Sequence, residues 1–123
     1  MTVTDLTKIE QAIGQHLPTS YRDFMTRYPE ELASIAGDFE FLADADRIVQ
    51  LNDDLRRMPF YQGKSWPDRL LAIGENGCGD YYFLDLRDAS GAVLFVDHET
   101  MDYQTLASNV EEWAPKLMQE LRP

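Results

Sequence analysis

Short hydrophobic runs separated by polar turns occupy the middle of the chain, between residues 70 and 96. The apolar runs cover residues 70–73, 81–86 and 92–96, and the segments between them are rich in Gly, Asn, Asp and Ser. Runs of this length with many Val, Ile, Phe and Tyr residues are typical of β-strands, and the residues between them are typical of tight turns. The pattern predicts an antiparallel β-meander at the centre of the fold.

On the N-terminal side of this meander, apolar residues recur at helical spacing. Residues 5–17 predict an amphipathic helix that ends before Pro18, and a second helix is expected to begin near Pro18 and to end at Pro29. A third helix is predicted after Asp44, whose side chain is placed to cap it. The apolar positions of the three helices are Leu6, Ile9, Ile13 and Leu17; Tyr21, Phe24, Met25 and Tyr28; and Ile48, Leu51 and Leu55.

Residues 30–46 are irregular apart from one short alternation. Phe39 and Phe41 flank Glu40 in residues 39–42, a pattern that predicts a further strand and brings the sheet to about four strands. The expected fold class is therefore α+β, with an antiparallel sheet flanked by helices.

The C-terminal segment predicts a last helix with a defined start. Ser108 and Glu111 have the spacing of a capping box, in which each side chain accepts a hydrogen bond from the backbone N–H of the other residue. Val110, Trp113 and Leu117 then share one face of the helix. Because Pro115 removes a helical hydrogen bond, we expect a kink or a restart of the helix there.

Length and charge limit the function classes. With 123 residues, of which 44% are hydrophobic, the chain is expected to form one domain over residues 1–123, and we expect a monomer. The formal net charge of -11 argues against binding to nucleic acid or to an anionic membrane. Solubility and a basic protein partner both explain such a charge.

Sequence features that report on the compartment favour the cytoplasm. No apolar run reaches the roughly 18 to 20 residues that a membrane span requires, and the polar first residues do not resemble a secretory signal. The chain has one cysteine, Cys78, so an internal disulfide is excluded.

Residues that suggest catalysis lack the partners that catalysis needs. Gly74, Gly77 and Gly79 follow the spacing GxxGxG between two strands, which fits a hairpin turn better than a phosphate loop. A triad of Cys78, His98 and an acid is a weak alternative, as is a metal site at residues 97–99, where neighbouring side chains point in opposite directions. We expect no catalytic residue, no metal and no cofactor, and keep a hydrolase based on Cys78 or on a carboxylate pair as a minor alternative.

The acidic residues gather in two segments. Residues 30–54 hold eight acids opposed within that span only by Arg47, and residues 75–102 hold seven opposed only by Arg87. If the two segments share a face, they form a strongly negative surface that suits a basic protein, whereas the alternative is a solvated surface with no partner. The predicted partner contacts are Asp38, Glu40, Asp53, Asp54, Glu75, Asp80 and Asp88.

The second run of the meander carries aromatic side chains on both faces of the predicted sheet. Strand alternation places Tyr81, Phe83 and Asp85 on one face, and Tyr82 on the other face with Leu84 and Leu86. The second of these faces looks like core. The first mixes rings with acids, as a protein-binding surface does, unless helices cover both faces.

Three segments, taken in order, resemble the SUKH superfamily, which is related to the yeast cell-wall synthesis regulator. They are residues 17–25 (LPTSYRDFM), residues 70–85, in which residues 73–80 (IGENGCGD) are the most specific, and residues 93–99 (VLFVDHE), followed by the helix that begins near Ser108. The resemblance implies an α+β domain without catalytic activity, in which the motif residues build the fold.

For function, the resemblance implies a cytoplasmic immunity protein of the bacterial type. Such a protein binds and occludes a cognate polymorphic or contact-dependent toxin, often a nuclease or a nucleic-acid deaminase. The acidic charge would then serve as a phosphate mimic in a basic cleft of the toxin. The alternative is a non-enzymatic regulatory or scaffold domain, and a toxin-like gene immediately upstream would favour the first interpretation.

Overall fold

The chain folds around a four-stranded antiparallel sheet with the strand order β1-β2-β3-β4. The computed structural model describes residues 1–28, 30–36, 40–57, 67, 69–76, 80–97 and 102–121. In chain order its elements are α1 (Val3–Ile13), α2 (Thr19–Thr26), α3 (Glu30–Ala36), α4 (Ala45–Arg57), β1 (Leu70–Glu75), β2 (Tyr81–Asp85), β3 (Val93–Val96), β4 (Tyr103–Ala107) and α5 (Val110–Leu121). The α+β class and the central meander are confirmed.

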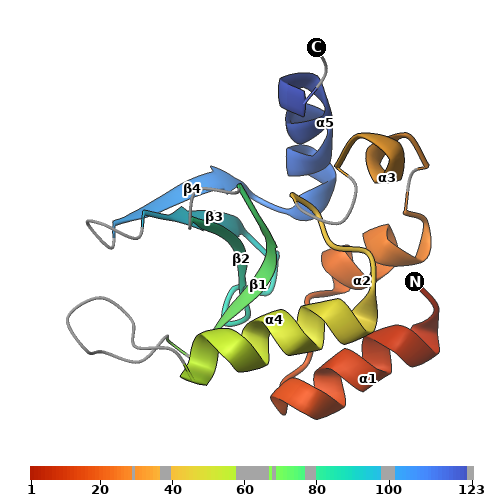
Figure 1. Cartoon of the computed structure of the whole chain (residues 1–123), viewed down its shortest axis with the longest axis vertical. Helices are drawn as coiled ribbons and strands as arrows, with labels where there is room; N and C mark the ends of the chain where they lie inside the picture. Colours follow the sequence, from red (N-terminus) through yellow and green to blue (C-terminus); the bar gives the residue numbers. More distant parts are fainter. Residues whose placement is uncertain are drawn as a thin grey trace.

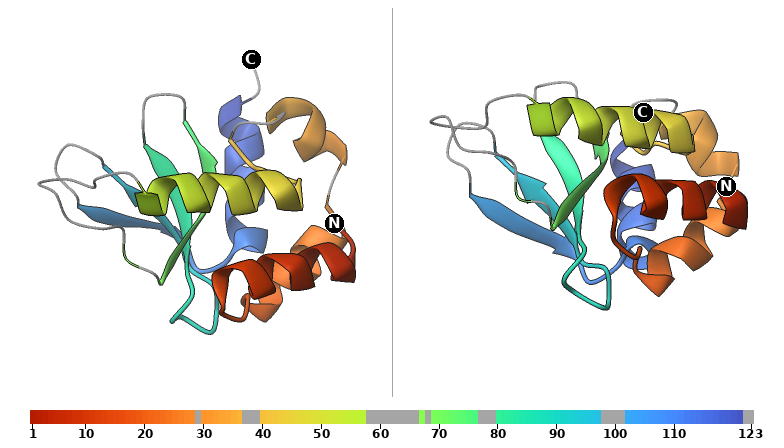
Figure 2. Two further views of the ribbon diagram at one scale, coloured as in Figure 1. Left: turned by 60° about the horizontal axis from the view of Figure 1, so that its bottom comes forward. Right: turned by 90° about the horizontal axis from the view of Figure 1, so that it is seen from below.

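The helices are distributed unevenly about the sheet. Helices α1, α2, α3 and α5 lie on one side of it, and α4 runs across the β1 edge (Figures 1 and 2). In the described part of the chain no helix is long and apolar enough to cross a membrane.

Hydrophobic side chains form two clusters, one on each face of the sheet. Leu71, Ile73 and Leu84 belong to the larger cluster, in which side chains from α1, α2, α4 and α5 are also buried. The smaller cluster includes Phe83, which is 1% exposed, and Leu55 of α4. The predicted alternation of faces is therefore confirmed. Phe83 is not part of an open binding surface, because side chains cover both faces of the sheet at that point.

The first two helices are shorter than the sequence pattern predicts. Helix α1 ends at Ile13 instead of Leu17, because Gly14 adopts a left-handed conformation (φ 70°) and its N–H bonds to the carbonyl of Glu10. Helix α2 begins after Pro18 and ends at Thr26, and Pro29 lies outside the described residues. Helix α3 falls in a segment that was expected to be irregular.

Residues 40–42 do not form the expected strand, although they run beside β1. The N–H of Leu42 donates to the carbonyl of Ile73 over 2.9 Å, but both backbone groups of the neighbouring Ala72 bond to the Asn52 side chain. Because Asn52 occupies this stretch of the strand edge, a continuous ladder cannot form there. Phe39 lies outside the described residues.

The fourth strand is β4, which the sequence pattern did not predict. It pairs with β3, and the side chains of its first three residues are exposed, so it lacks a hydrophobic run.

The N-caps of α4 and α5 differ in how well they were predicted. Asp44 caps α4 as expected, because its carboxylate accepts from the N–H of Asp46 over 2.8 Å. The cap of α5 is Asn109, not Ser108, since the Asn109 side chain accepts from the N–H of Glu112 over 2.9 Å. Helix α5 contains Pro115 within a single helical element.

Candidate protein-binding groove

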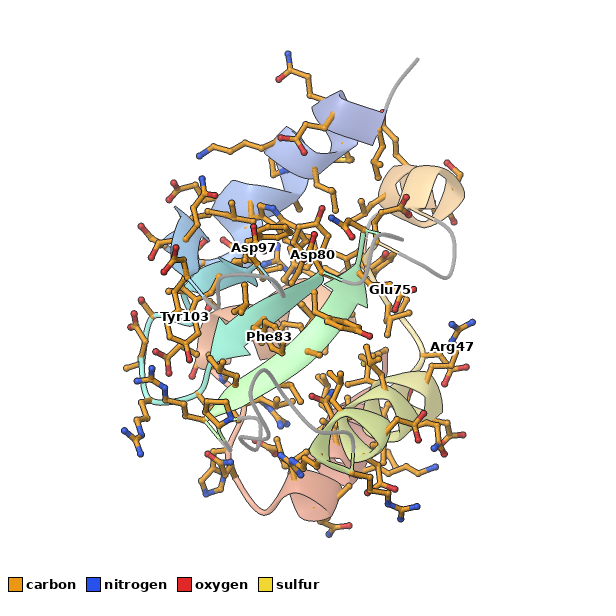
Figure 3. All side chains as sticks on the ribbon, turned by 60° about the vertical axis from the view of Figure 1, so that its left-hand side comes forward. Arg47, Glu75, Asp80, Phe83, Asp97 and Tyr103 are labelled. Carbon is orange, nitrogen blue, oxygen red and sulfur yellow. The ribbon has the colours of Figure 1, made fainter. Side chains whose placement is uncertain are left out.

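Acidic residues collect at one end of the sheet. The register aligns Glu75 with Tyr81, Tyr81 with Val96, and Val96 with Tyr103, so the acids flanking these positions share one end. Asn76 joins two of the strands, because its N–H donates to the Asp80 carbonyl over 3.1 Å. Figure 3 shows Glu75, Asp80 and Asp97 along this end of the sheet. We call Glu75, Asp80, Asp97 and Asp102 the acidic end.

Beside the acidic end, a groove of about 310 Å³ lies between the sheet and α5. Its aromatic wall is formed by Tyr82 of β2, Phe95 of β3 and Trp113 of α5. The Tyr82 ring centroid lies 4.9 Å from that of Trp113 and 5.7 Å from that of Phe95. Trp113 is 3% exposed and stacks on Phe41. The remaining lining residues are Asn76, Gln104, Leu106, Lys116 and Glu120. We call this site the Tyr82 groove.

The electrostatic environment of Tyr82 reports the negative charge around the groove. Burial raises the pKa of the Tyr82 hydroxyl, and the carboxylates of Glu120, Glu40 and Asp80 raise it further. These acids come from three distant parts of the chain, so the fold brings them together. On the other face, burial and the Glu75 carboxylate raise the pKa of Tyr81. Negative charge therefore reaches both faces at this end.

Arginine residues collect at the opposite end of the sheet. Arg69 precedes β1 and Arg87 follows β2, and with Arg56 they line a cleft of about 440 Å³. These arginines and the acidic end therefore lie at opposite ends of the strands.

The predicted contact residues are divided among several regions. Glu40 and Asp80 lie near the Tyr82 groove, and Glu75 lies at the same end of the sheet. Asp53 and Asp54 are exposed on α4, where Asp53 pairs with Arg57 over 3.0 Å and Asp54 accepts from Gln50 over 2.8 Å.

Asp88 belongs to a third region, the turn after β2 at the far end of the sheet. The Ser90 hydroxyl and N–H both donate to the Asp88 carboxylate and hold its pKa below the usual range. Asp38 lies outside the described residues.

The first acidic segment, residues 30–54, is neutralised by cations more than its local sequence indicates. Lys8 of α1 pairs with Asp46, and Arg57 pairs with Asp53, so cations from outside residues 30–54 partly neutralise it. Of the predicted contacts in residues 30–54, Glu40 lies near Tyr82, as does Asp80 of the second acidic segment.

Several residues of the groove were not predicted as functional. Trp113 has helical core spacing, Phe95 lies in a strand, and Glu120 is one of many exposed acids. Phe95 could be found only from its pairing with Tyr82, which requires the strand register, and Trp113 and Glu120 only from the packing of α5 beside the sheet. Cys78 and His98, the alternative catalytic residues, lie outside the described residues. Within the described ranges, no group of three His, Cys, Asp or Glu side chains is placed to hold a metal ion.

Comparison with known families decides the classification of the chain. The model of the SMI1 / KNR4 family (SUKH-1) matches residues 1–116. The chain belongs to the SUKH-1 family. No curated protein and no solved structure gave a match. The SUKH family includes immunity proteins and is not typically enzymatic. In this SUKH-1 chain, the signature at residues 73–80 builds part of the acidic end, because Ile73 and Glu75 lie in β1 and Asp80 precedes β2.

Proposed function

We propose that this chain is an immunity protein that binds a cognate basic toxin and occludes its active site. The observation that carries the proposal is the Tyr82 groove, which is lined by aromatic side chains and lies close enough to Glu120, Glu40 and Asp80 for their carboxylates to raise the pKa of the Tyr82 hydroxyl. Membership of a family that includes immunity proteins supports it.

The composition of the groove suits a protein partner. Binding energy at protein interfaces concentrates in buried aromatic and arginine side chains, whereas charges at the rim steer the encounter. The groove supplies the half-buried Tyr82 and Phe95 for the first role, and the acidic end supplies carboxylates for the second.

The negative charge also indicates the class of toxin. A toxin that cleaves or deaminates nucleic acid needs cationic side chains to bind phosphates. Carboxylates on the surface of an inhibitor can take the place of those phosphates. We therefore propose a nuclease or a nucleic-acid deaminase as the partner and the cytoplasm, where such substrates are found, as the site of action. The chain would act as a monomer that blocks the basic cleft.

The proposal is tested by growth protection in bacteria. The toxin domain encoded by the gene immediately upstream is expressed with or without this chain, and the pair is then purified through a tag on the toxin. We expect this chain to restore growth and to co-purify in equal amounts with the toxin. Growth arrest despite full expression of the folded chain would refute the immunity role. Capture of a host regulatory protein instead would favour the alternative of a scaffold domain.

Charge-matched variants connect this assay to the site. E40Q/D80N/E120Q removes three acids at the Tyr82 groove, and D53N/D54N/D88N removes three acids elsewhere. Both lower the magnitude of the net charge of -11 by the same amount. We expect the groove variant to lose protection at low expression and the other variant to keep it.

A further inference from the structure

The Tyr82 groove has the dimensions of a pocket for a single side chain. Its volume of about 310 Å³ is at the lower limit of small-molecule sites, which span roughly 300 to 1,000 Å³. The groove also borders the acidic end, because its lining residue Asn76 donates its N–H to the Asp80 carbonyl.

The rings of the groove favour a cation. The faces of Tyr, Phe and Trp rings carry negative potential and attract an ammonium or a guanidinium within roughly 6 Å. The Tyr82 ring is tilted by 48° from Trp113 and by 49° from Phe95, so the rings do not stack flat on each other. Tyr82 and Phe95 are also only half-buried, which leaves ring surface open to the groove.

The exposed carboxylate of Glu120, one of the lining residues, provides the opposite charge. Within the described residues, Glu120 forms no hydrogen bond and no ion pair, although it lines the groove. The groove's own cation, Lys116, lies one turn earlier on α5 with its ammonium 3.6 Å from the Glu112 carboxylate. Glu120 is therefore available to an incoming cation.

From this arrangement we propose that the Tyr82 groove binds one arginine side chain of the partner protein, with the guanidinium against Tyr82 and Phe95 and paired with Glu120. Arginine is favoured over lysine because its planar guanidinium stacks on aromatic rings and forms two parallel hydrogen bonds to a carboxylate. The inference rests on the proposed function, since it names the group by which the toxin is held. The site itself, however, can be tested without the toxin.

The test is an NMR titration of the folded, ¹⁵N-labelled chain with N-acetyl-arginine amide. The neutral analogue N-acetyl-glutamine amide is the control ligand. We expect saturable shifts at the Trp113 indole N–H and at the Tyr82 and Phe95 amides, with millimolar affinity and at least fivefold preference for the arginine probe. The variants E120Q and F95L should each weaken the binding about fivefold. D54N, an exposed acid on α4, should leave it unchanged.

The outcomes separate this inference from the proposed function. Absence of saturable shifts at the groove, equal shifts with the neutral probe, or equal affinity in E120Q would overturn the arginine site. If the chain protects against the toxin but does not bind the arginine probe, only the arginine site is refuted. If it binds the probe but protects against no toxin, the arginine site stands and the immunity role is refuted.

Discussion

Replacing Asn52 should destabilise the protein more than any surface change on the same helix. Asn52 is the one polar residue found buried among those described, at 4% exposure. Its amide nitrogen donates to the carbonyls of Ile48 and Ala72, each over 2.8 Å, and its carbonyl accepts from the N–H of Ala72 over 2.7 Å. The side chain thus takes the place of a neighbouring strand at the β1 edge.

The cost of Asn52→Ala follows from the groups it leaves unpaired. The N–H and the carbonyl of Ala72 would both lose their partner inside the core, where Ala72 is 0% exposed. Leaving a buried polar group unsatisfied costs about 1 to 3 kcal/mol, so we expect a loss of about 2 to 5 kcal/mol in the free energy of unfolding. The free energy of unfolding of small domains is about 5 to 15 kcal/mol, so the variant should be close to unfolding.

Urea unfolding followed by circular dichroism measures this loss. Gln50→Ala is the control on the same helix, because Gln50 is exposed and only donates to Asp54. We expect the control to change the unfolding free energy by less than about 0.5 kcal/mol. A loss below about 1 kcal/mol for Asn52→Ala would refute the reasoning, because water or another group would then satisfy Ala72.

Two further predictions concern packing and pH. Gly74→Ala should cost about 3 kcal/mol, because an added Cβ would lie 1.9 Å from the backbone oxygen of Glu40. Gly14→Ala should cost about 1 kcal/mol, because an added Cβ would meet nothing within 4 Å and only the left-handed backbone would be strained. Thermal unfolding of the two glycine variants measures the difference in stability between them. Burial raises the pKa of Tyr28 to about 12 from 10.0, so the unfolded chain loses this proton first and stability should fall as pH rises from 10 towards 12. Urea unfolding at several pH values should show a smaller fall for Tyr28→Phe, and an unchanged fall would contradict the assignment.

The strands of the meander could be predicted because each contains a buried hydrophobic run. The expected 70–73, 81–86 and 92–96 differ from the observed strands by no more than two residues at either end. Strand β4 could not be found in this way, because its exposed side chains give no hydrophobic signal and its position depends on pairing with β3. Phe41 misled the prediction, since it is buried against Trp113 without belonging to a strand.

The candidate site could be predicted only in part. Sequence clustering identified Glu40 and Asp80, which the fold brings near the same tyrosine. It could not identify Glu120, because the last helix reaches the groove through packing between residues far apart in the chain. Local clustering also grouped Asp53 with Glu40, although α4 carries Asp53 and pairs it with Arg57.

The electrostatic basis of the proposed toxin binding is tested most directly by the salt dependence of affinity in the two charge-matched variants. Isothermal titration calorimetry with the purified toxin domain, at low and at high salt, gives the dissociation constant of the natural chain, of E40Q/D80N/E120Q and of D53N/D54N/D88N. We expect the natural chain to bind more weakly at high salt. The groove variant should bind at least tenfold more weakly at low salt with a reduced salt dependence, and the other variant should resemble the natural chain. Equal affinities for all three chains, or tight binding that does not change with salt, would contradict recognition through the acidic groove.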